Sequence, residues 1–420
     1  MSRRSPAVPR RAVLQGGLAS FAMLMSQPWL GGCSRRTSTA GTSRAQTASA
    51  AITPRLAADG GVDRRLVSKI AEVGPLGAPD ANGVRLPAGF RARVIARTRE
   101  RVVPGKEYLW HASPDGGATF GTEDGGWIYV SNSEEPRGGG VGAVRFDRDG
   151  VIVDAYAILS NTSTNCAGGP TPWSTWLSCE EIAKGQVYEC DPRGARPATV
   201  RPALGTFRHE AVSIDPVRHH AYLTEDEPDG CFYRFVPDAL GAHGFADLSA
   251  GRLEVAVVEL GAVSWRPVPD PRYEKSTPTR FQVRAATHFN GGEGIWWHDG
   301  VVYFTTKGDN RVHAFDTRSS KIRVLYDAAR EKSPLLYGVD NVTVSASGDV
   351  LVAEDGGRMK IVAILPSGEL KELMQLVGHP DSEITGPAFD PSGTRLYFSS
   401  QRGVRGGTTF EITGPFHVEA

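Results

Sequence analysis

The segment AYLTEDEPDGCFYRFV (221–236) has an apolar run, then a dense acidic stretch, then a second apolar run. Its apolar runs are rich in β-branched and aromatic residues, which favour strands. The acidic stretch holds Glu225, Asp226, Glu227 and Asp229. Carboxylates this close repel one another unless cations or protons neutralise them. The segment therefore predicts two strands, with a demand for positive charge where the first strand ends.

The same pattern, an apolar strand followed by small or acidic residues, occurs at six places in the chain: WIYVSNSEE (127–135), TWLSCEE (175–181), AYLTEDE (221–227), VYFTTKGD (302–309), VLVAEDGG (350–357) and LYFSSQRG (396–403). The first small residues after these strands are separated by 47, 46, 81, 48 and 46 positions. A period of about 45 residues with about four strands per repeat is typical of β-propeller blades. We therefore predict an all-β, six-bladed β-propeller over residues 75–420. A β-sandwich would leave the fixed period unexplained.

One repeat is longer than the others by about 34 residues, which predicts an insertion at about 238–285. The insertion contains SWRPVPDPRYEKSTPTRF, a polar and proline-rich stretch. Such a composition suits a lid or a rim over a site rather than another blade.

The N-terminal region predicts export. Residues 1–33 combine an arginine-rich start with the apolar run AVLQGGLASFAMLMSQPWLGG (12–32), the layout of a signal peptide. PRRAVLQ around Arg10 and Arg11 resembles a twin-arginine (Tat) signal, and LGGC resembles a lipobox that would lipidate Cys33. An ordinary cleaved signal is the alternative. Residues 34–74 are predicted to be a flexible tether, and the protein to lie in the periplasm or on the outer cell surface.

The overall charge excludes two kinds of partner. Lys plus Arg and Asp plus Glu both number 47, so the formal net charge is zero. This balance offers no basic surface for nucleic acid or for an anionic membrane. We expect the Tat machinery as a partner, and membrane attachment only through the lipid.

Acidic residues recur at matching places in the repeats. With the recurring strands taken as the innermost ones, the channel-lining positions are Asn132, Cys179, Glu225, Thr306, Glu354 and Ser400. The preceding turns supply a second set, Glu210, Glu293, Asp340 and Glu383. Carboxylates that converge in one channel need bound cations. Oxygen donors suit calcium, and a thiolate among them favours a transition metal such as iron.

Four motifs resemble those of the PhoX-type alkaline phosphatases: CAGGPTPWSTWLSCEE (166–181), FRHEAVSIDP (207–216), YLTEDEPDGCFYRFVP (222–237) and DNVTVSASGDVLVAEDGG (340–357). The resemblance covers about residues 75–405. It implies Tat export, a six-bladed propeller, a site with iron and calcium, and hydrolysis of small phosphate esters.

The resemblance also implies roles for individual residues. Cys179 would be the iron-ligating cysteine, and the carboxylate ligands would be Glu180, Glu225, Glu293 and Glu354, with Glu210 and Asp226 as further candidates. Cys179, Glu225 and Glu354 would carry catalysis. The cations expected to hold the phosphate are His209, Lys307 and Arg402.

Some features depart from the family pattern. The chain is shorter than the founding members, and Asn132 and Thr306 are weaker ligands than carboxylates. A calcium-dependent, lactonase-like propeller hydrolase, which needs no thiol, and a non-enzymatic binding propeller remain alternatives. Cys166, Cys190 and Cys231 are an odd number of further cysteines, of which one pair could form a disulfide.

Overall fold

The computed structural model describes residues 66–403 and 406–420. The predicted signal peptide, Cys33 and residues 34–65 of the predicted tether lie outside the described residues. The end of that tether, residues 66–74, carries strand β1 (Leu66–Ser68) and a 3₁₀ turn, η1 (Ile70–Glu72), and β1 pairs with β29 (His417–Glu419). Among the described residues, no helix is long and apolar enough to span a bilayer.

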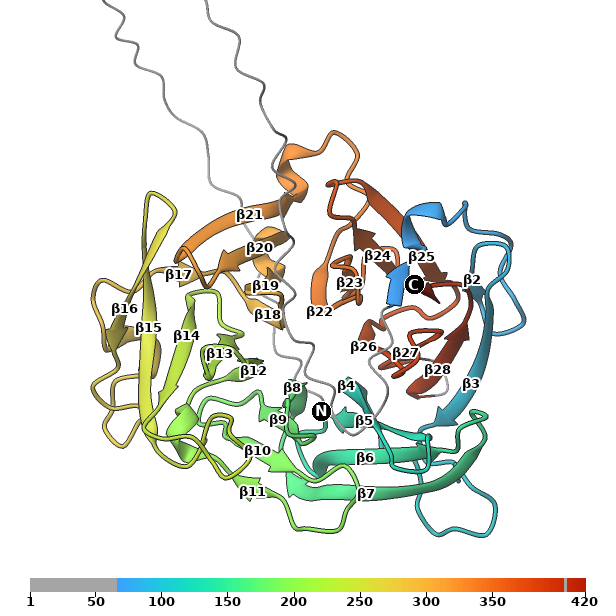
Figure 1. The fold of residues 1–420 in the computed structure, drawn as a ribbon, viewed down its shortest axis with the longest axis horizontal. Helices are drawn as coiled ribbons and strands as arrows, with labels where there is room; N and C mark the ends of the chain where they lie inside the picture. The colour runs from blue at the N-terminus through green and yellow to red at the C-terminus, as the bar shows by residue number, and fades with distance from the viewer. Residues whose placement is uncertain (1–65, 404–405) are drawn as a thin grey trace, which may run out of the picture. The chain divides into compact units, whose positions relative to one another are not determined.

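The described chain is built from antiparallel strands in sheets arranged around a common centre (Figure 1), which confirms the prediction of an all-β, propeller-like fold. Two of the four-stranded sheets are formed by consecutive strands. They comprise β4 (Pro114–Gly121), β5 (Trp127–Ser133), β6 (Gly139–Phe146) and β7 (Ile152–Thr162), and β8 (Asn165–Pro170), β9 (Trp176–Glu180), β10 (Val187–Cys190) and β11 (Thr199–Val200).

The largest sheet holds ten strands. They are β12 (His209–Asp215), β13 (His220–Glu225), β14 (Gly230–Pro237), β15 (Gly251–Glu259), β16 (Ala262–Pro267), β17 (His288–Phe289), β18 (Gly292–His298), β19 (Val301–Thr306), β20 (Arg311–Asp316) and β21 (Lys321–Asp327). A single residue pair, Ala262 with Lys321, joins β16 to β21. The predicted insertion at 238–285 thus contributes β15 and β16 to a sheet, followed by a loop that carries η3 (Thr279–Phe281).

The last two large sheets combine segments from both ends of the described chain. One contains β2 (Val84–Arg85), β22 (Val339–Val344), β23 (Val350–Glu354), β24 (Lys360–Ile364) and β25 (Leu370–Leu376), and the other contains β3 (Arg91–Arg97), β26 (Ile384–Phe389), β27 (Arg395–Ser400) and β28 (Thr408–Thr413). Because β3 pairs with β28, the two ends of the fold are hydrogen-bonded together. The remaining 3₁₀ turns are η2 (Pro202–Leu204), η4 (Lys307–Asp309) and η5 (Ala328–Arg330).

Apolar side chains pack between neighbouring sheets. One cluster joins Trp127, Tyr129 and Phe146 of the β4–β7 sheet to Tyr397 of β27. The Tyr129 and Tyr397 rings stack with centroids 4.9 Å apart, and the Trp127 indole N–H donates to the Tyr397 hydroxyl at 2.9 Å. Each such buried aromatic contributes about 1.5–3 kcal/mol, so these contacts hold one sheet against the next.

The innermost strands are β4, β8, β12, β18, β22 and β26 (Figure 1). Residues of all six strands line one central pocket. The sequence-based assignment placed the following strand of each repeat in this position and was therefore wrong by one strand. Glycines allow the inner strands to approach closely. A Cβ on Gly169 of β8 would lie 1.7 Å from the Val212 carbonyl oxygen of β12, and one on Gly294 of β18 would lie 2.5 Å from the Val342 nitrogen of β22.

Candidate metal centre

Acidic residues and one thiol stand at the starts of the inner strands. Five of them are the second residue of their strand: Asp115, Cys166, Glu210, Glu293 and Asp340. A sixth, Glu383, directly precedes β26. In each of those five strands the register with the next strand shifts just after the first paired residue, as at a β-bulge. Bulges re-aim side chains, and these six side chains are buried.

A second set of charged residues follows the neighbouring strands. Glu134, Glu181, Asp226, Lys307 and Asp355 each come directly after a strand end, and Arg402 comes two residues after one. Since each inner strand pairs with the strand that follows it in antiparallel fashion, the end of that following strand lies beside the start of the inner strand. The topology thus brings both sets to the same end of the central pocket.

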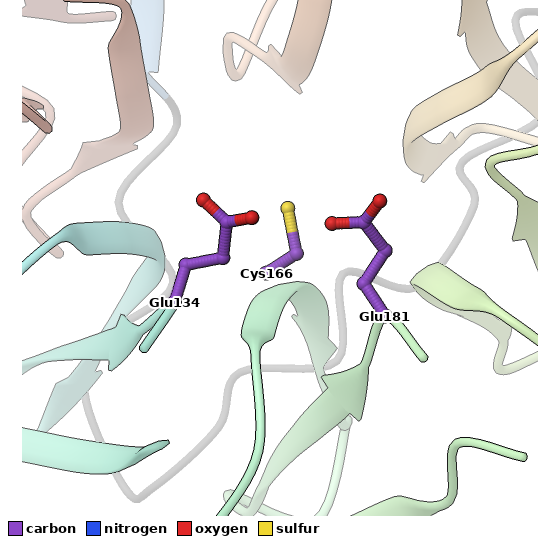
Figure 2. A group of neighbouring side chains, drawn as sticks. All are labelled: Glu134, Cys166 and Glu181. Carbon is purple, nitrogen blue, oxygen red and sulfur yellow. The ribbon is translucent and has the colours of Figure 1, made fainter. Parts of the chain in front are cut away.

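Four groups of three side chains have ligand atoms that lie within 4.8 Å of one another: Glu134–Cys166–Glu181, Asp115–Glu134–Glu383, Glu210–Glu293–Asp340 and Asp340–Asp355–Glu383. Figure 2 shows the first group, in which the Cys166 sulfur lies between the two carboxylates. The groups share Glu134, Asp340 and Glu383, so they form a continuous cluster rather than separate sites.

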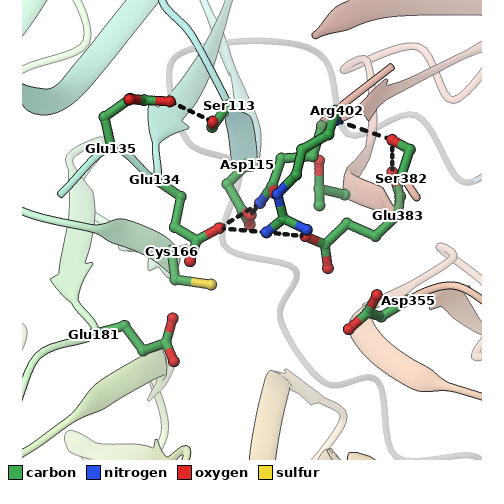
Figure 3. A network of polar contacts seen from close by, with 12 residues as sticks. Ser113, Asp115, Glu134, Glu135, Cys166, Glu181, Asp355, Ser382, Glu383 and Arg402 are labelled. Atoms are coloured by element: carbon green, nitrogen blue, oxygen red, sulfur yellow. Dashed lines mark hydrogen bonds and ion pairs between the residues drawn. The ribbon is translucent and has the colours of Figure 1, made fainter. Parts of the chain in front are cut away.

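Three basic side chains contact this cluster. Arg208 lies 2.6 Å from Glu181 and 4.0 Å from Asp226. The Lys307 ammonium lies 2.9 Å from Glu293, 3.3 Å from Asp340 and 3.2 Å from Asp355. Arg402 bridges Glu134 at 3.2 Å and Glu383 at 2.8 Å (Figure 3). The carboxylates still outnumber these cations.

Burial and mutual repulsion raise the pKa values of the acids in the cluster. Burial is the main cause of the raised pKa of Glu181, about 9, and of Glu383, about 8, and neighbouring carboxylates add to it. The pKa values of Asp115, Glu210 and Glu293 are raised well above the usual range for the same two reasons. Burial and the surrounding carboxylates also raise the pKa of the Cys166 thiol. Bound cations would therefore lower the cost of the charged forms.

The donor set fits metal ions. The Cys166 thiol donates to Glu210 Oε1 at 3.3 Å, while Glu210 Oε2 is buried without a hydrogen-bond partner. A buried carboxylate oxygen that lacks a partner is costly and is well satisfied by a cation. A thiolate with carboxylates suits a transition metal, and the groups made only of oxygen donors suit calcium.

Several residues predicted from the sequence lie in this cluster. Glu210 and Glu293 share one group with Asp340. Asp226 lies beside Arg208, and Lys307 and Arg402 contact the carboxylates directly.

Cys179 does not reach the cluster. It is fully buried in the apolar core beside Leu177, Val187 and Phe207. Cys166 occupies the place expected for it, because Cys166 lies on an inner strand whereas Cys179 lies on the next strand outward. The four cysteines of the described residues, Cys166, Cys179, Cys190 and Cys231, are all free thiols.

Glu180, Glu225 and Glu354 are bound inside their own sheets instead. Glu180 accepts from the Ser163 and Gln186 amides, and Glu354 from the Tyr337, Arg358 and Lys360 amides. Glu225 accepts from the Tyr233 hydroxyl at 2.7 Å and from Arg280 at 3.3 Å. Each is the last residue of its strand, and the residue after it reaches the cluster, since successive side chains of a strand face opposite ways.

His209 is also turned away. Its ring packs on Phe207, with centroids 3.7 Å apart, and its Nε2 lies 3.1 Å from the Gly205 carbonyl oxygen. Burial lowers the pKa of His209 to about 3, so the ring is neutral and poorly suited to hold a phosphate.

Sequence reasoning missed six residues around the cluster: Asp115, Glu134, Cys166, Glu181, Arg208 and Asp355. The alignment of Glu210, Glu293, Asp340 and Glu383 could have revealed two of them, Asp115 and Cys166. If it is extended to the first two repeats, Asp115 and Cys166 stand at the same place.

Comparisons with known proteins agree with this architecture. Residues 152–333, from β7 to just beyond η5, match the family model described as Alkaline phosphatase PhoX. PhoX from Pseudomonas fluorescens, solved in complex with vanadate, superposes with a TM-score of 0.65 at 16% identity, over 81% of this chain and 97% of that chain, which shows a shared fold. The gluconolactonase XC5397 from Xanthomonas campestris gives a TM-score of 0.45 at 13% identity, over 82% and 98% of the two chains. A search of the curated proteins found no match. The family model over residues 152–333 and the shared fold both support the resemblance to the PhoX alkaline phosphatases that the sequence motifs predicted.

Proposed function

We propose that the protein is an exported, metal-dependent phosphatase that hydrolyses small phosphate esters at the cluster around Cys166. One observation carries the proposal: a thiol and carboxylates from different sheets converge within 4.8 Å at one end of the central pocket. The match of residues 152–333 to the family model described as Alkaline phosphatase PhoX supports the reaction class. The related Pseudomonas structure holds vanadate, described as a transition state analogue.

We propose six blades. The ten-stranded sheet divides into β12–β15, with β16 beside β15, and β18–β21, since only the Ala262–Lys321 pair joins β16 to β21. With the four other large sheets, this division gives six units, each with one inner strand. The loop at 268–287 would then form a rim near the site, because Arg280 contacts Glu225, Glu227 and Asp229.

We assign iron to Glu134–Cys166–Glu181 and calcium to the groups that hold only carboxylates. The thiolate distinguishes the two, since calcium prefers oxygen ligands and softer metals accept sulfur. When bound, such ions supply Lewis-acid chemistry and neutralise charge on a phosphoryl group. The Cys166 thiol also weighs against a lactonase-like hydrolase that uses calcium alone.

The chain's own residues would orient the substrate. Arg208 and Arg402 stand at the cluster with side chains 38% and 52% exposed, so each can contact its carboxylates and still reach an arriving anion. A guanidinium can bind two phosphate oxygens at once, which fixes the orientation of the phosphoryl group. The buried inner strands hold the carboxylates in place behind it.

Export by the Tat route, with Cys33 as a possible lipid anchor, remains part of the proposal. The route suits a protein whose metal site is assembled before translocation. Fractionation of cells that express the full chain tests it, because Arg10→Lys/Arg11→Lys should keep the protein in the cytoplasm.

The decisive experiment compares two cysteine variants. We expect the exported protein to hydrolyse p-nitrophenyl phosphate and to contain iron and calcium by elemental analysis. Cys166→Ser should lose the iron and reduce kcat by about 100-fold or more, the scale of losing a transition-state interaction. Cys179→Ser is the matched control, since that thiol is buried in the core, and it should keep both iron and activity.

The opposite pattern would contradict the assignment. If Cys179→Ser lost iron while Cys166→Ser kept it, the cluster would not be the metal centre. A metal-loaded wild-type protein that releases no phosphate from any ester would leave a binding propeller as the function.

A further inference from the structure

Lys307 breaks the pattern of the charged residues that follow the strands. At the matching places of four other repeats the chain has Glu134, Glu181, Asp226 and Asp355, all carboxylates, and the last repeat has the neutral Gln401. Lys307 follows β19 directly and begins η4. Its backbone N–H donates to the Gly291 carbonyl at 2.8 Å, and the next residue, Gly308, packs so tightly against Asn290 that a Cβ would lie 2.3 Å from Asn290 Oδ1. The turn therefore fixes where the lysine side chain starts.

The ammonium stands where two of the carboxylate groups meet. It lies 2.9 Å from Glu293 Oε1, 3.3 Å from Asp340 Oδ2 and 3.2 Å from Asp355 Oδ2. Glu293 and Asp340 belong to the group with Glu210, while Asp340 and Asp355 belong to the group with Glu383. The contact with Asp340 is a hydrogen bond, and those with Glu293 and Asp355 are ion pairs, so one ammonium neutralises part of both groups.

The ammonium stands in the place of a cation, since oxygens of Glu293, Asp340 and Asp355 all lie within 3.3 Å of it. A calcium ion bound by the same oxygens would need them at about 2.3–2.6 Å, which leaves no space for the ammonium between them. Lysine and metal ion thus exclude each other here.

Lys307 leaves one side of the cluster without a counter-charge. It does not satisfy Glu210 Oε2, which is buried and lacks a hydrogen-bond partner, and Glu210 Oε1 accepts from the Cys166 thiol. The carboxylate oxygen that still lacks a cation is therefore on the Cys166 side of the cluster, away from Asp355. We propose that the Lys307 ammonium permanently replaces one metal ion, so that the metals of this protein bind on the Cys166 side of the cluster.

This inference rests on the proposed function only in assuming that the cluster takes up metal. The test is metal stoichiometry, measured by elemental analysis and calcium titration calorimetry on the full exported chain. We expect Lys307→Met to bind one additional calcium ion per chain, because three carboxylates lose their ammonium. Lys307→Arg keeps the positive charge and should bind the wild-type number.

Lys360→Met is the matched control. Lys360 pairs with Glu372 away from the cluster, so its removal should leave the metal count unchanged. An equal calcium count in Lys307→Met and the wild type would overturn the proposal. If Lys307→Met folds poorly in chelator, thermal unfolding decides: calcium should raise its melting temperature more than that of the wild type, and an equal or smaller rise would also overturn the proposal. A wild-type protein without phosphatase activity would refute the proposed function. It would not change the number of calcium ions expected in the Lys307 variants.

Discussion

Glu180 and Glu181 are adjacent in the chain and have different surroundings. Glu180 accepts hydrogen bonds from the Ser163 amide at 3.1 Å and the Gln186 amide at 3.2 Å. Glu181 lies in the group with Glu134 and Cys166 and contacts Arg208 at 2.6 Å. At the scale of single residues, one carboxylate stabilises the backbone while its neighbour faces the candidate metal centre.

The pair permits a sharp comparison. We expect Glu181→Gln to reduce iron content and to lower kcat/KM by about 100-fold, since a charged ligand becomes a neutral amide. Glu180→Gln should keep iron and kcat/KM, and should cost about 1–2 kcal/mol of unfolding free energy, because one backbone amide loses a charged acceptor. Steady-state assays and urea unfolding of both variants measure this, and the reverse assignment of effects would contradict it.

The same alternation explains where sequence reasoning failed. The acidic clusters after the strands were recognised, but Glu180 and Glu354 were chosen rather than Glu181 and Asp355, and Glu225 was ranked above Asp226. A sequence shows that a strand ends in acidic residues. It does not show at which residue the strand ends, and a shift by one position reverses the direction of the side chain.

At the scale of strands, the approach of β8 to β12 depends on Gly169. A Cβ there would lie 1.7 Å from the Val212 carbonyl oxygen, which is backbone and cannot rotate away. We expect Gly169→Ala to lower the free energy of unfolding by about 3 kcal/mol. Because Cys166 lies on the same strand, the variant should also lose iron.

Gly74→Ala is the control for this variant. No atom lies within 4 Å of a Cβ at Gly74, so its unfolding free energy should change by less than about 0.5 kcal/mol. Denaturant unfolding of both variants gives the comparison. A Gly169→Ala protein as stable as the wild type would show that the inner strands can separate without cost.

The loop at 268–287 is held by one arginine. Arg280 contacts Asp229 at 2.8 Å, Glu225 at 3.3 Å and Glu227 at 3.5 Å, and Glu225 is fully buried. We expect Arg280→Met to cost about 3 kcal/mol, since a buried carboxylate loses its counter-ion. Hydrogen exchange in residues 268–287 should become faster. Arg266→Met, at an exposed position of β16, should leave the exchange unchanged.

The acidic stretch at 225–229 is thus neutralised in two ways. Glu225, Glu227 and Asp229 are paired with Arg280, while Asp226 contacts Arg208 beside the cluster. The repeat period predicted the propeller-like fold because it depends on spacing alone. It could not reveal that a loop far along the chain supplies the arginine, since such a contact depends on the packing of the whole sheet.

At the scale of the whole molecule, the raised pKa values predict how the metal-free protein responds to pH. Burial is the main cause in each case, and it raises the pKa to about 7 for Glu225, about 8 for Glu383 and about 9 for Glu181. The unfolded chain releases these protons near pH 4.5, so the folded state binds more protons than the unfolded state above that pH. Folding stability must then fall as the pH rises through 7 to 9.

Other groups do not obscure this window. Burial lowers the pKa of His111 and His209 to about 3 and of His220 and His313 to about 4. Those histidines add stability as the pH rises toward about 6.5, and their effect is complete above it. Between pH 7 and 9 we therefore expect the melting temperature in EDTA to fall steadily. Calcium and iron should flatten this slope, because bound cations favour the charged carboxylates, and Glu383→Gln should reduce it in EDTA. A melting temperature in EDTA that rises between pH 7 and 9 would show that the cluster carboxylates are already ionised in the folded protein without metal.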